Sequence, residues 1–309
     1  MIVLHHNDLD GRCAAAIVSG WAGIKPVYKT NPFMAVEMDY AKSVPFDLIG
    51  NGEQVWIVDF SLSLSDMDKL RTITKDIVWI DHHKTAIAKY VDYPHKIIGI
   101  RRDEEAGCVL TWKYVHWYSA RGSKAPDFNQ PCGPGLEVPR AVAMIGDYDT
   151  WAHKIKDSTA FYEGMKLQDT SPETGVWFDL MTEVAVHPDG SDASVDRCGP
   201  IIKEGMVALR YRDSYCKDMC DCYGFESELD GVKCWVTNIY RFGSLGFGER
   251  RLKYPLLVAC VFDGNRWTIS LYTEDKTLDV SEIAKRYGGG GHRGASGFVC
   301  DVFPFKRRG

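Results

Sequence analysis

The sequence predicts an α/β protein in which a mostly parallel sheet flanked by helices is followed by a linker helix and a smaller α/β domain. Two short apolar runs, typical of strands buried on both faces, each end in an acid, at Asp59 and at Asp81. About twenty residues separate the two acids, enough for a helical crossover between parallel neighbours. From about residue 230 the pattern changes to strands joined by short turns, which predicts the second domain.

The elements of the first part follow from apolar runs and capping residues. The chain opens with a strand at 2–4, and a helix over 12–21 contains three consecutive alanines that allow close packing on a sheet. Serines between 61 and 65 can cap a helix over 66–74, between the strands that end at 58 and 80. The remaining expectations are strands at 25–29 and 97–100, turn-rich chain over 30–53, helices over 103–118, 139–145, 158–168 and 173–186, and an exposed insertion over 121–136.

The second part begins with a long helix over 201–223. Strands at 255–262 and 267–273 are separated by Asp-Gly-Asn-Arg, a good hairpin turn. Further elements are a strand at 232–240, a helix over 279–287 and a strand at 298–300. A turn-rich stretch at 187–191 places the boundary, so we predict domains at 1–190 and 229–309 with a linker helix region at 191–228.

Composition limits the function classes. The 309 residues carry a net charge of −5, which argues against a general basic field for long nucleic acid. There is no apolar run of about eighteen residues, and the chain starts directly with a strand, so we expect a cytoplasmic protein with reduced cysteines. A zinc site at Cys216, Cys220 and Cys222 is a minor alternative, because no second pair of ligands lies close by.

Acids and imidazoles follow three strands of the predicted sheet. Carboxyl ends of parallel strands share one edge, where ligands bind in open α/β sheets. We expect His6, Asp8 and Asp10 on one side of an extended segment, near Asp59 and the Asp81-His82-His83 triplet, although each motif alone could be a cap or a loop. The Gly-Asp-Tyr-Asp sequence offers a further acid, and we favour Asp147 over Asp149 because Asp147 directly follows the apolar helix.

This edge has the composition of a metal site. Four carboxylates, those of Asp8, Asp10, Asp59 and Asp147, balance two divalent cations by formal charge. Mixed oxygen and imidazole ligands favour Mn²⁺ over Ca²⁺ or structural Zn²⁺, with Mg²⁺ or Co²⁺ as alternatives. Two such cations can clamp a phosphoryl oxygen.

A glycine-rich run at 288–297 lies between a predicted helix and a predicted strand. Glycines let backbone N–H groups approach an anion closely, and an arginine fork suits phosphate. We therefore expect Gly290, Gly291, His292 and Arg293 to bind a substrate phosphate, the alternative being a flexible linker.

Five motifs occur in order: HNDLDG, VDF, DHH, GDYD and GGGGHRGASG. Together they resemble the DHH phosphoesterase superfamily with its DHH-associated carboxyl-terminal domain, and the resemblance covers nearly the whole chain. HNDLDG and the DYD-Trp ending are most similar to the oligoribonuclease (nano-RNase) branch.

The resemblance implies a ligand set and an activity. His6, Asp8 and Asp59 would hold one metal, and Asp59 would bridge to a second. Asp81 would orient one of the metal ligands without binding a metal itself. His83, His292 and Arg293 would contact the substrate phosphate. The implied activity is two-metal hydrolysis of very short RNA or linear dinucleotides. The implied ligands of the second metal are Asp10, Asp59, His82 and Asp147.

Other functions remain open at this point. A RecJ-like exonuclease on single-stranded DNA is disfavoured by the short chain, and a pyrophosphatase by the carboxyl-terminal domain. A cyclic-dinucleotide phosphodiesterase and a non-enzymatic nucleotide-sensing module are further alternatives, although the intact ligand set argues against the sensor. The expected partner is a short oligonucleotide or dinucleotide, with no membrane and no long duplex, and a homodimer is left open.

Overall fold

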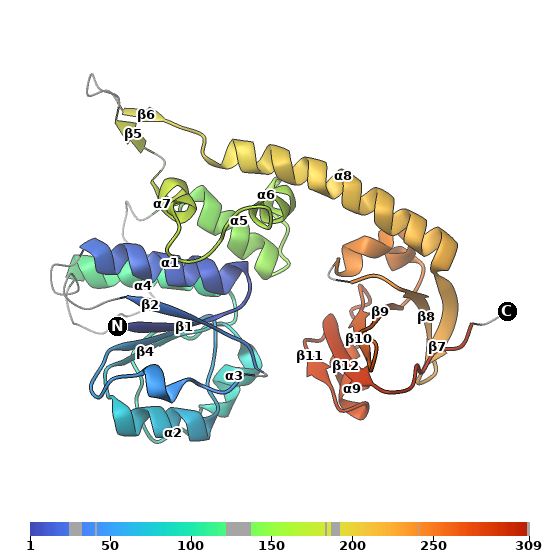
Figure 1. The fold of residues 1–309 in the computed structure, drawn as a ribbon, viewed down its shortest axis with the longest axis horizontal. Coiled ribbons are helices and arrows are strands. Elements are labelled where there is room, and N and C mark those ends of the chain that lie inside the picture. Colours follow the sequence, from blue (N-terminus) through green and yellow to red (C-terminus); the bar gives the residue numbers. More distant parts are fainter. Residues whose placement is uncertain are drawn as a thin grey trace. The chain divides into compact units, whose positions relative to one another are not determined.

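The computed structural model divides the chain into two compact units, residues 1–206 and 207–309, and the division falls inside the long helix α8 (Cys198–Tyr223). The first unit is a parallel sheet with helices and the second is a smaller unit built on a mixed sheet, as predicted (Figure 1). The structure describes residues 1–24, 33–40, 42–121, 137–182, 184–186, 192–240 and 242–307. The predicted boundary stretch, 187–191, lies outside these ranges.

The sheet of the first unit has four parallel strands in the order β2-β1-β3-β4. The predicted strand at 2–4 and the two predicted strands that end at 58 and 80 are confirmed as β1, β3 and β4. β2 falls in the range expected to be turn-rich, and this expectation was wrong because an edge strand that is only partly buried lacks a continuous apolar run. The strand predicted at 25–29 lies outside the described residues. The bounds are β1 (Ile2–His6), β2 (Met34–Met38), β3 (Val55–Val58) and β4 (Ile77–Ile80).

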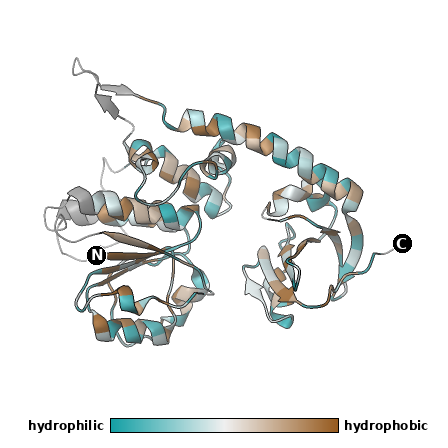
Figure 2. Cartoon of the chain, in the orientation of Figure 1, coloured by the Kyte–Doolittle hydropathy of each residue, from teal (hydrophilic) through white to brown (hydrophobic). Residues whose placement is uncertain are grey.

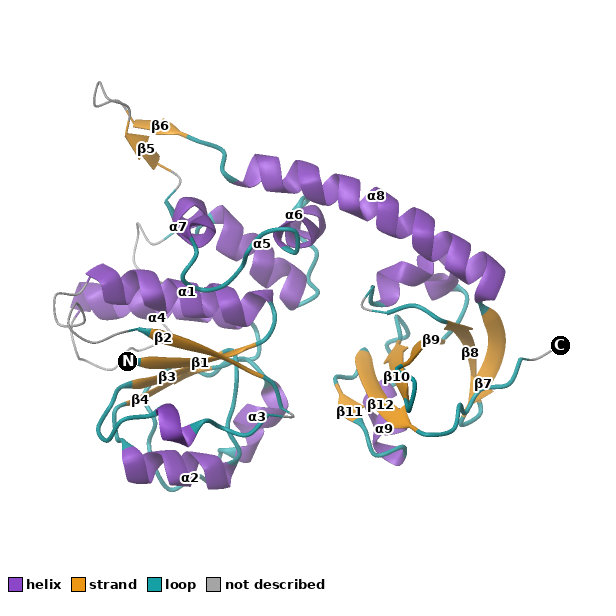
Figure 3. Ribbon diagram, in the orientation of Figure 1, coloured by secondary structure: helices purple, strands orange, loops and turns teal. Residues whose placement is uncertain are grey.

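Helices cover both faces of this sheet (Figure 3). α1 (Leu9–Ile24) and α4 (Gly107–Arg121) lie on one face, where Trp56 contacts Trp21 and Tyr114. α2 (Leu64–Ile73), capped by Ser63 as expected, lies on the other, where Ile57 shares a core with Met67. Burial on both faces explains why the strands are hydrophobic along their length (Figure 2).

Two elements near β4 differ from prediction. Residues 97–100 form no regular strand, because Gly99 has φ +126 and only isolated bridges join this segment to β4. α4 begins at Gly107 rather than at residue 103, so the acids at 103–105 precede the helix and do not sit in its first turn. A short helix, α3 (Lys84–Lys89), follows the DHH triplet.

The first unit continues with three helices and a hairpin. α5 (Arg140–Asp149) runs four residues beyond its predicted end, so the GDYD motif forms its last turn. α7 ends at 181, before the predicted 186, and residues 184–186 form a short strand instead. The predicted insertion at 121–136 lies outside the described residues except for Arg121, which ends α4. The bounds are α6 (Ser158–Met165), α7 (Gly175–Met181), β5 (Val184–Val186) and β6 (Asp192–Ser194).

The second unit contains a six-stranded sheet in the order β11-β12-β10-β9-β8-β7. The predicted hairpin is confirmed, with Asp263 accepting hydrogen bonds from the amides of Asn265 and Arg266. The strand β7 was not predicted. The bounds are β7 (Phe225–Leu229), β8 (Val232–Thr237), β9 (Leu256–Phe262), β10 (Trp267–Tyr272), α9 (Val280–Arg286), β11 (Gly290–Gly291) and β12 (Ala295–Cys300).

Within the described residues, no helix combines the length and the apolar composition needed to cross a lipid bilayer.

Candidate metal centre

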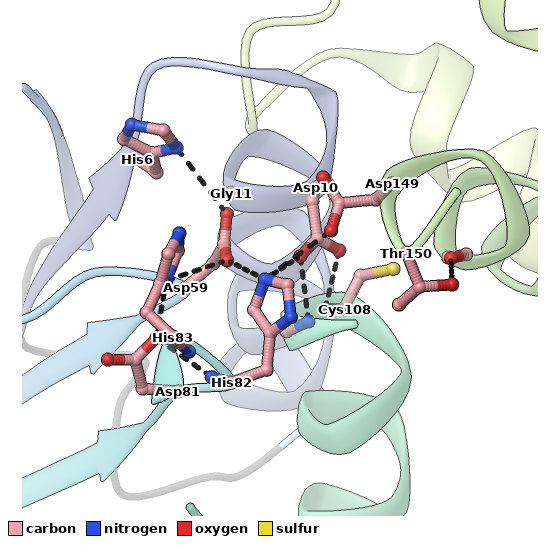
Figure 4. Close-up of polar contacts among 12 residues, drawn as sticks. His6, Asp10, Gly11, Asp59, Asp81, His82, His83, Cys108, Asp149 and Thr150 are labelled. Atoms are coloured by element: carbon pink, nitrogen blue, oxygen red, sulfur yellow. Dashed lines mark hydrogen bonds and ion pairs between the residues drawn. The ribbon is translucent and has the colours of Figure 1, made fainter. Parts of the chain in front are cut away.

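The carboxyl ends of β1, β3 and β4 bring polar side chains together at one edge of the sheet (Figure 4). His6 ends β1, Asp59 follows β3, and the DHH triplet follows β4. Asp10 lies in the first turn of α1, not in the extended segment that we expected. A β-carbon at Gly11 would come within 2.4 Å of the His6 carbonyl oxygen, so glycine lets α1 start directly against the end of β1.

Asp10 is fixed by the start of another helix. Its two carboxylate oxygens accept hydrogen bonds from the amides of Gly107 (2.7 Å) and Cys108 (2.8 Å) at the amino terminus of α4. Free amides and the helix dipole both favour a carboxylate there. A β-carbon at Gly107 would lie 2.6 Å from the β-carbon of Asp59, so this position must be glycine. Nothing in the spacing of the motifs pointed to Gly107.

Asp59 is a carboxylate of this site that no hydrogen bond stabilises within the described residues. It is buried, its backbone has φ +51, and neither carboxylate oxygen accepts a hydrogen bond within the described residues. Burial, together with Asp10, Asp8 and Asp149, raises the pKa of Asp59 well above its usual value. A buried carboxylate among other carboxylates requires a positive counter-charge. The residues present therefore fit bound cations.

One group of candidate ligands surrounds His82. Its Nε2 lies 3.1 Å from Asp59 Oδ1, 3.4 Å from Asp149 Oδ2 and 3.7 Å from Asp10 Oδ2. The ligand atoms of Asp10, His82 and Asp149 lie within 4.8 Å of one another, close enough to share one ion. Burial lowers the pKa of His82, which keeps the imidazole neutral and available as a ligand.

A second group lies on the other side of Asp59. His6 Nδ1 lies 2.6 Å from Asp8 Oδ2 and 3.8 Å from Asp59 Oδ2, and these three residues also meet within 4.8 Å. Burial raises the pKa of Asp8, but hydrogen bonds from His6 and the Gly11 amide bring it down to about 2. Asp59 thus stands between two sets of oxygen and nitrogen donors.

The fourth acid of the site is Asp149, so our preference for Asp147 was wrong. α5 continues through the GDYD motif, and residues two apart on a helix project to nearly opposite sides. The Asp147 carboxylate instead accepts hydrogen bonds from the amides of Lys154 (2.8 Å) and Ile155 (3.1 Å). Burial and the neighbouring Asp10 and Asp8 raise the pKa of Asp149 well above its usual value.

Asp81 holds the DHH triplet in place. Its Oδ1 accepts hydrogen bonds from the amides of His82 (2.8 Å) and His83 (3.2 Å), and His83 Nδ1 lies 2.8 Å from the same oxygen. Burial lowers the pKa of His83, but the bond to Asp81 and the charges of Asp81, Asp8 and Asp10 together outweigh it, and the net shift is upward. This geometry suits an orienting role for Asp81 and a donor role for His83.

The glycine-rich residues belong to the second unit. Gly290 and Gly291 form β11 at the edge of its sheet, and His292 and Arg293 are exposed in the turn to β12. Gly291 has φ +140, where other residues would be strained. Arg293 donates one hydrogen bond to the Lys276 carbonyl oxygen.

The cysteines of α8 form no such cluster. Cys216 and Cys220 are buried and Cys222 is exposed. In the part of the chain that the structure describes, the groups that could hold a metal ion consist of His and Asp alone.

Comparison with known proteins finds distant relatives of this chain. No family model matches the chain. An uncharacterised protein of Acanthamoeba polyphaga mimivirus, R106, is 24% identical over 279 residues, covering 82% of this chain and 56% of the viral protein. Oligoribonuclease NrnB of Bacillus subtilis is 24% identical over 317 residues, covering 96% of this chain and 71% of NrnB. The chain therefore spans little more than half the length of the viral relative.

Solved structures share the fold over nearly the whole chain. A structure described as the DHH domain of a member of a ribosomal protein family matches with a TM-score of 0.54 and 13% identity, covering 97% of this chain and 82% of that one. The chain therefore shares the fold of this DHH domain. Two further solved structures match comparably. They are the pGpG-specific phosphodiesterase PggH from Vibrio cholerae (TM-score 0.50, 14% identity, 97% and 93% coverage) and RecJ from Thermus thermophilus in complex with Mn²⁺ (0.51, 12%, 97% and 49%).

Proposed function

We propose that this DHH protein is a metal-dependent phosphodiesterase that hydrolyses very short RNA or linear dinucleotides in the cytoplasm. The observation that carries the proposal is the buried Asp59 carboxylate, which has no hydrogen-bond partner within the described residues and lies between two donor sets. Among its relatives, NrnB is named an oligoribonuclease and PggH a pGpG-specific phosphodiesterase, which supports the short substrate.

Two divalent cations would account for the donor sets. Oxygen and imidazole donors without thiolate suit Mn²⁺, the ion described with RecJ. Bound cations would supply a water of lowered pKa and draw charge from the phosphoryl oxygens. The first cation would be held by His6, Asp8 and Asp59, and the second by Asp10, Asp59, His82 and Asp149.

The chain's own groups position the substrate phosphate. Asp81 fixes the His83 ring and raises its pKa, so His83 can donate a hydrogen bond to a non-bridging oxygen as negative charge develops there. Arg293 and His292, on the second unit, would bind a phosphate of the substrate, helped by the amides of Gly290 and Gly291.

Activity is tested with purified protein, Mn²⁺ and a substrate panel. The panel contains linear dinucleotides, RNA of increasing length, single-stranded DNA, cyclic dinucleotides and pyrophosphate. We expect linear dinucleotides to be hydrolysed with the highest kcat/KM. If no phosphodiester is hydrolysed with Mn²⁺, Mg²⁺ or Co²⁺, the enzymatic proposal fails and the nucleotide-sensing alternative replaces it.

Substrate length gives a first quantitative prediction. We expect kcat/KM to fall as RNA length rises from two to about ten nucleotides, with a shallow salt dependence, because each phosphate contact along a groove would steepen the salt slope. The net charge of −5 makes an extended basic groove unexpected. An efficiency that rises with length, together with a steep salt slope, would indicate a processive exonuclease of the RecJ kind instead.

Arg293→Ala tests the phosphate role of the second unit. We expect KM for a dinucleotide to rise about tenfold while Mn²⁺ binding stays unchanged, because the lost guanidinium contacts phosphate and not the cations. Arg266→Ala is the matched control, since Arg266 is an exposed arginine in the turn between β9 and β10 of the same unit and pairs with Asp301. Equal KM values for the two variants would remove Arg293 from the substrate site.

A further inference from the structure

The turn after α5 has an unusual backbone. Trp151 has φ +55 and His153 has φ +47, a left-handed conformation that bulky residues rarely adopt. Such residues persist only where surrounding contacts hold them, and they concentrate at functional sites. Here the holding group is Asp147, whose carboxylate accepts the amides of Lys154 and Ile155 and whose carbonyl oxygen accepts the amide of Ala152 at 3.0 Å.

The held turn presents an indole ring to solvent. Trp151 is 44% exposed, far more than a core tryptophan such as Trp177 at 2%. Its ring contacts with Tyr148 (5.5 Å, 71°) and His153 (4.4 Å, 76°) are both edge-on. Among the described residues, no aromatic ring stacks parallel to Trp151. The indole therefore has the exposed area that stacking by a flat ligand requires.

These rings adjoin the candidate metal centre. Tyr148 precedes Asp149 in α5 and stacks on Tyr162 of α6, with ring centroids 3.8 Å apart at 17°. Tyr162 in turn lies close enough to Asp8 and Asp149 that both, after burial, raise the pKa of its hydroxyl. The aromatic group therefore lies near the carboxylates at the sheet edge, next to Asp149 along α5.

We infer that Trp151, backed by Tyr148, stacks a nucleobase next to the scissile phosphate, and that Asp147 is the positioning residue that holds the turn. The inference rests on the proposed function and adds the chemical class of its substrate. Stacking on an aromatic ring is tolerant of base identity, so the surface selects nucleotides over base-free phosphoesters without selecting one base. Pyrophosphate has no base that could stack on the Trp151 ring.

Two variants at Trp151 test the stacking surface. With a dinucleotide, Trp151→Leu should raise KM about tenfold and change kcat little, while Trp151→Phe, which keeps an aromatic ring, should recover most of the loss. The matched substrate is the same dinucleotide with one base removed, tried at each position. For one abasic position the difference between wild type and Trp151→Leu should disappear. An unchanged KM in Trp151→Leu, or an equal rise for both abasic substrates, would overturn the inference.

Asp147→Asn tests the positioning role. It should raise KM in the same direction as Trp151→Leu, and combining the two changes should add little, because both act on one stacking contact. A fall in kcat with unchanged KM, or a fully additive double variant, would contradict this role.

A binding measurement separates this inference from the proposed function. AMP has no phosphodiester bond, so its quenching of tryptophan fluorescence reports binding without turnover. If AMP quenches the fluorescence of the wild type but not of Trp151→Phe, base stacking on Trp151 is supported even if no substrate is hydrolysed. Equal quenching in both proteins overturns it even if hydrolysis is found.

Discussion

Asp59→Asn should abolish Mn²⁺-dependent hydrolysis, with a loss of at least about 1000-fold in kcat, and should also stabilise the metal-free protein. The loss follows because the proposed ligand sets share Asp59, whose carboxylate oxygens lie 3.8 Å from His6 Nδ1 and 3.1 Å from His82 Nε2. The stabilisation follows because the ionised carboxylate is buried beside Asp8, Asp10 and Asp149 without a hydrogen bond in the described structure, whereas a neutral amide removes the repulsion. Asparagine also tolerates the φ of +51 at this position.

The stability effect of Asp59→Asn is read by thermal unfolding in chelator and in Mn²⁺. In chelator we expect the melting temperature to exceed that of wild type by about 2–8 °C, and in Mn²⁺ the order should reverse. Asp103→Asn, at an exposed acid outside the site, should leave both values unchanged. A metal-free variant that is less stable than wild type would show that Asp59 is stabilised by something other than a cation.

Asp149→Asn should lower kcat by at least about 100-fold, while Asp147→Asn should act mainly on KM. The two acids are two residues apart on α5, yet Asp149 Oδ2 lies 3.4 Å from His82 Nε2 and the Asp147 carboxylate is bound to backbone amides. Asn at 149 removes the charge that faces the cation. Asn at 147 keeps one acceptor oxygen for the turn.

Each of these variants is the control for the other, because the chemical change is the same and the location differs by one half-turn of the helix. Steady-state kinetics with a dinucleotide and Mn²⁺ titrations should therefore show the metal affinity falling only in Asp149→Asn. The opposite ranking would return the fourth ligand to Asp147.

The residues at the sheet edge could be predicted from sequence because each one directly follows its own strand along the chain. An apolar run that ends in an acid marks both the strand and the residue at its end, and parallel strands bring those ends together. Asp59, Asp81 and His82 lie at the ends of such strands, close to one another in the structure. The edge strand β2 was missed because partial burial leaves no such run.

The choice between Asp147 and Asp149 could not be made in this way. It depends on where α5 ends, and helix ends are the least certain part of a pattern-based assignment. A helix that ended at residue 145 would leave both acids in a loop with no defined facing, whereas the observed end at Asp149 gives them opposite directions. Gly107 is similar, since its role comes from the approach of α4 to Asp10 and Asp59, which are distant in sequence.

The central claim, two cations bridged by Asp59, is tested most directly by low-temperature electron paramagnetic resonance of the Mn²⁺-loaded protein. Ions about 3.5–4 Å apart are magnetically coupled. We expect a coupled two-manganese spectrum in wild type that is lost in Asp59→Asn. An isolated single-manganese signal in wild type, unchanged by Asp59→Asn, would contradict the account.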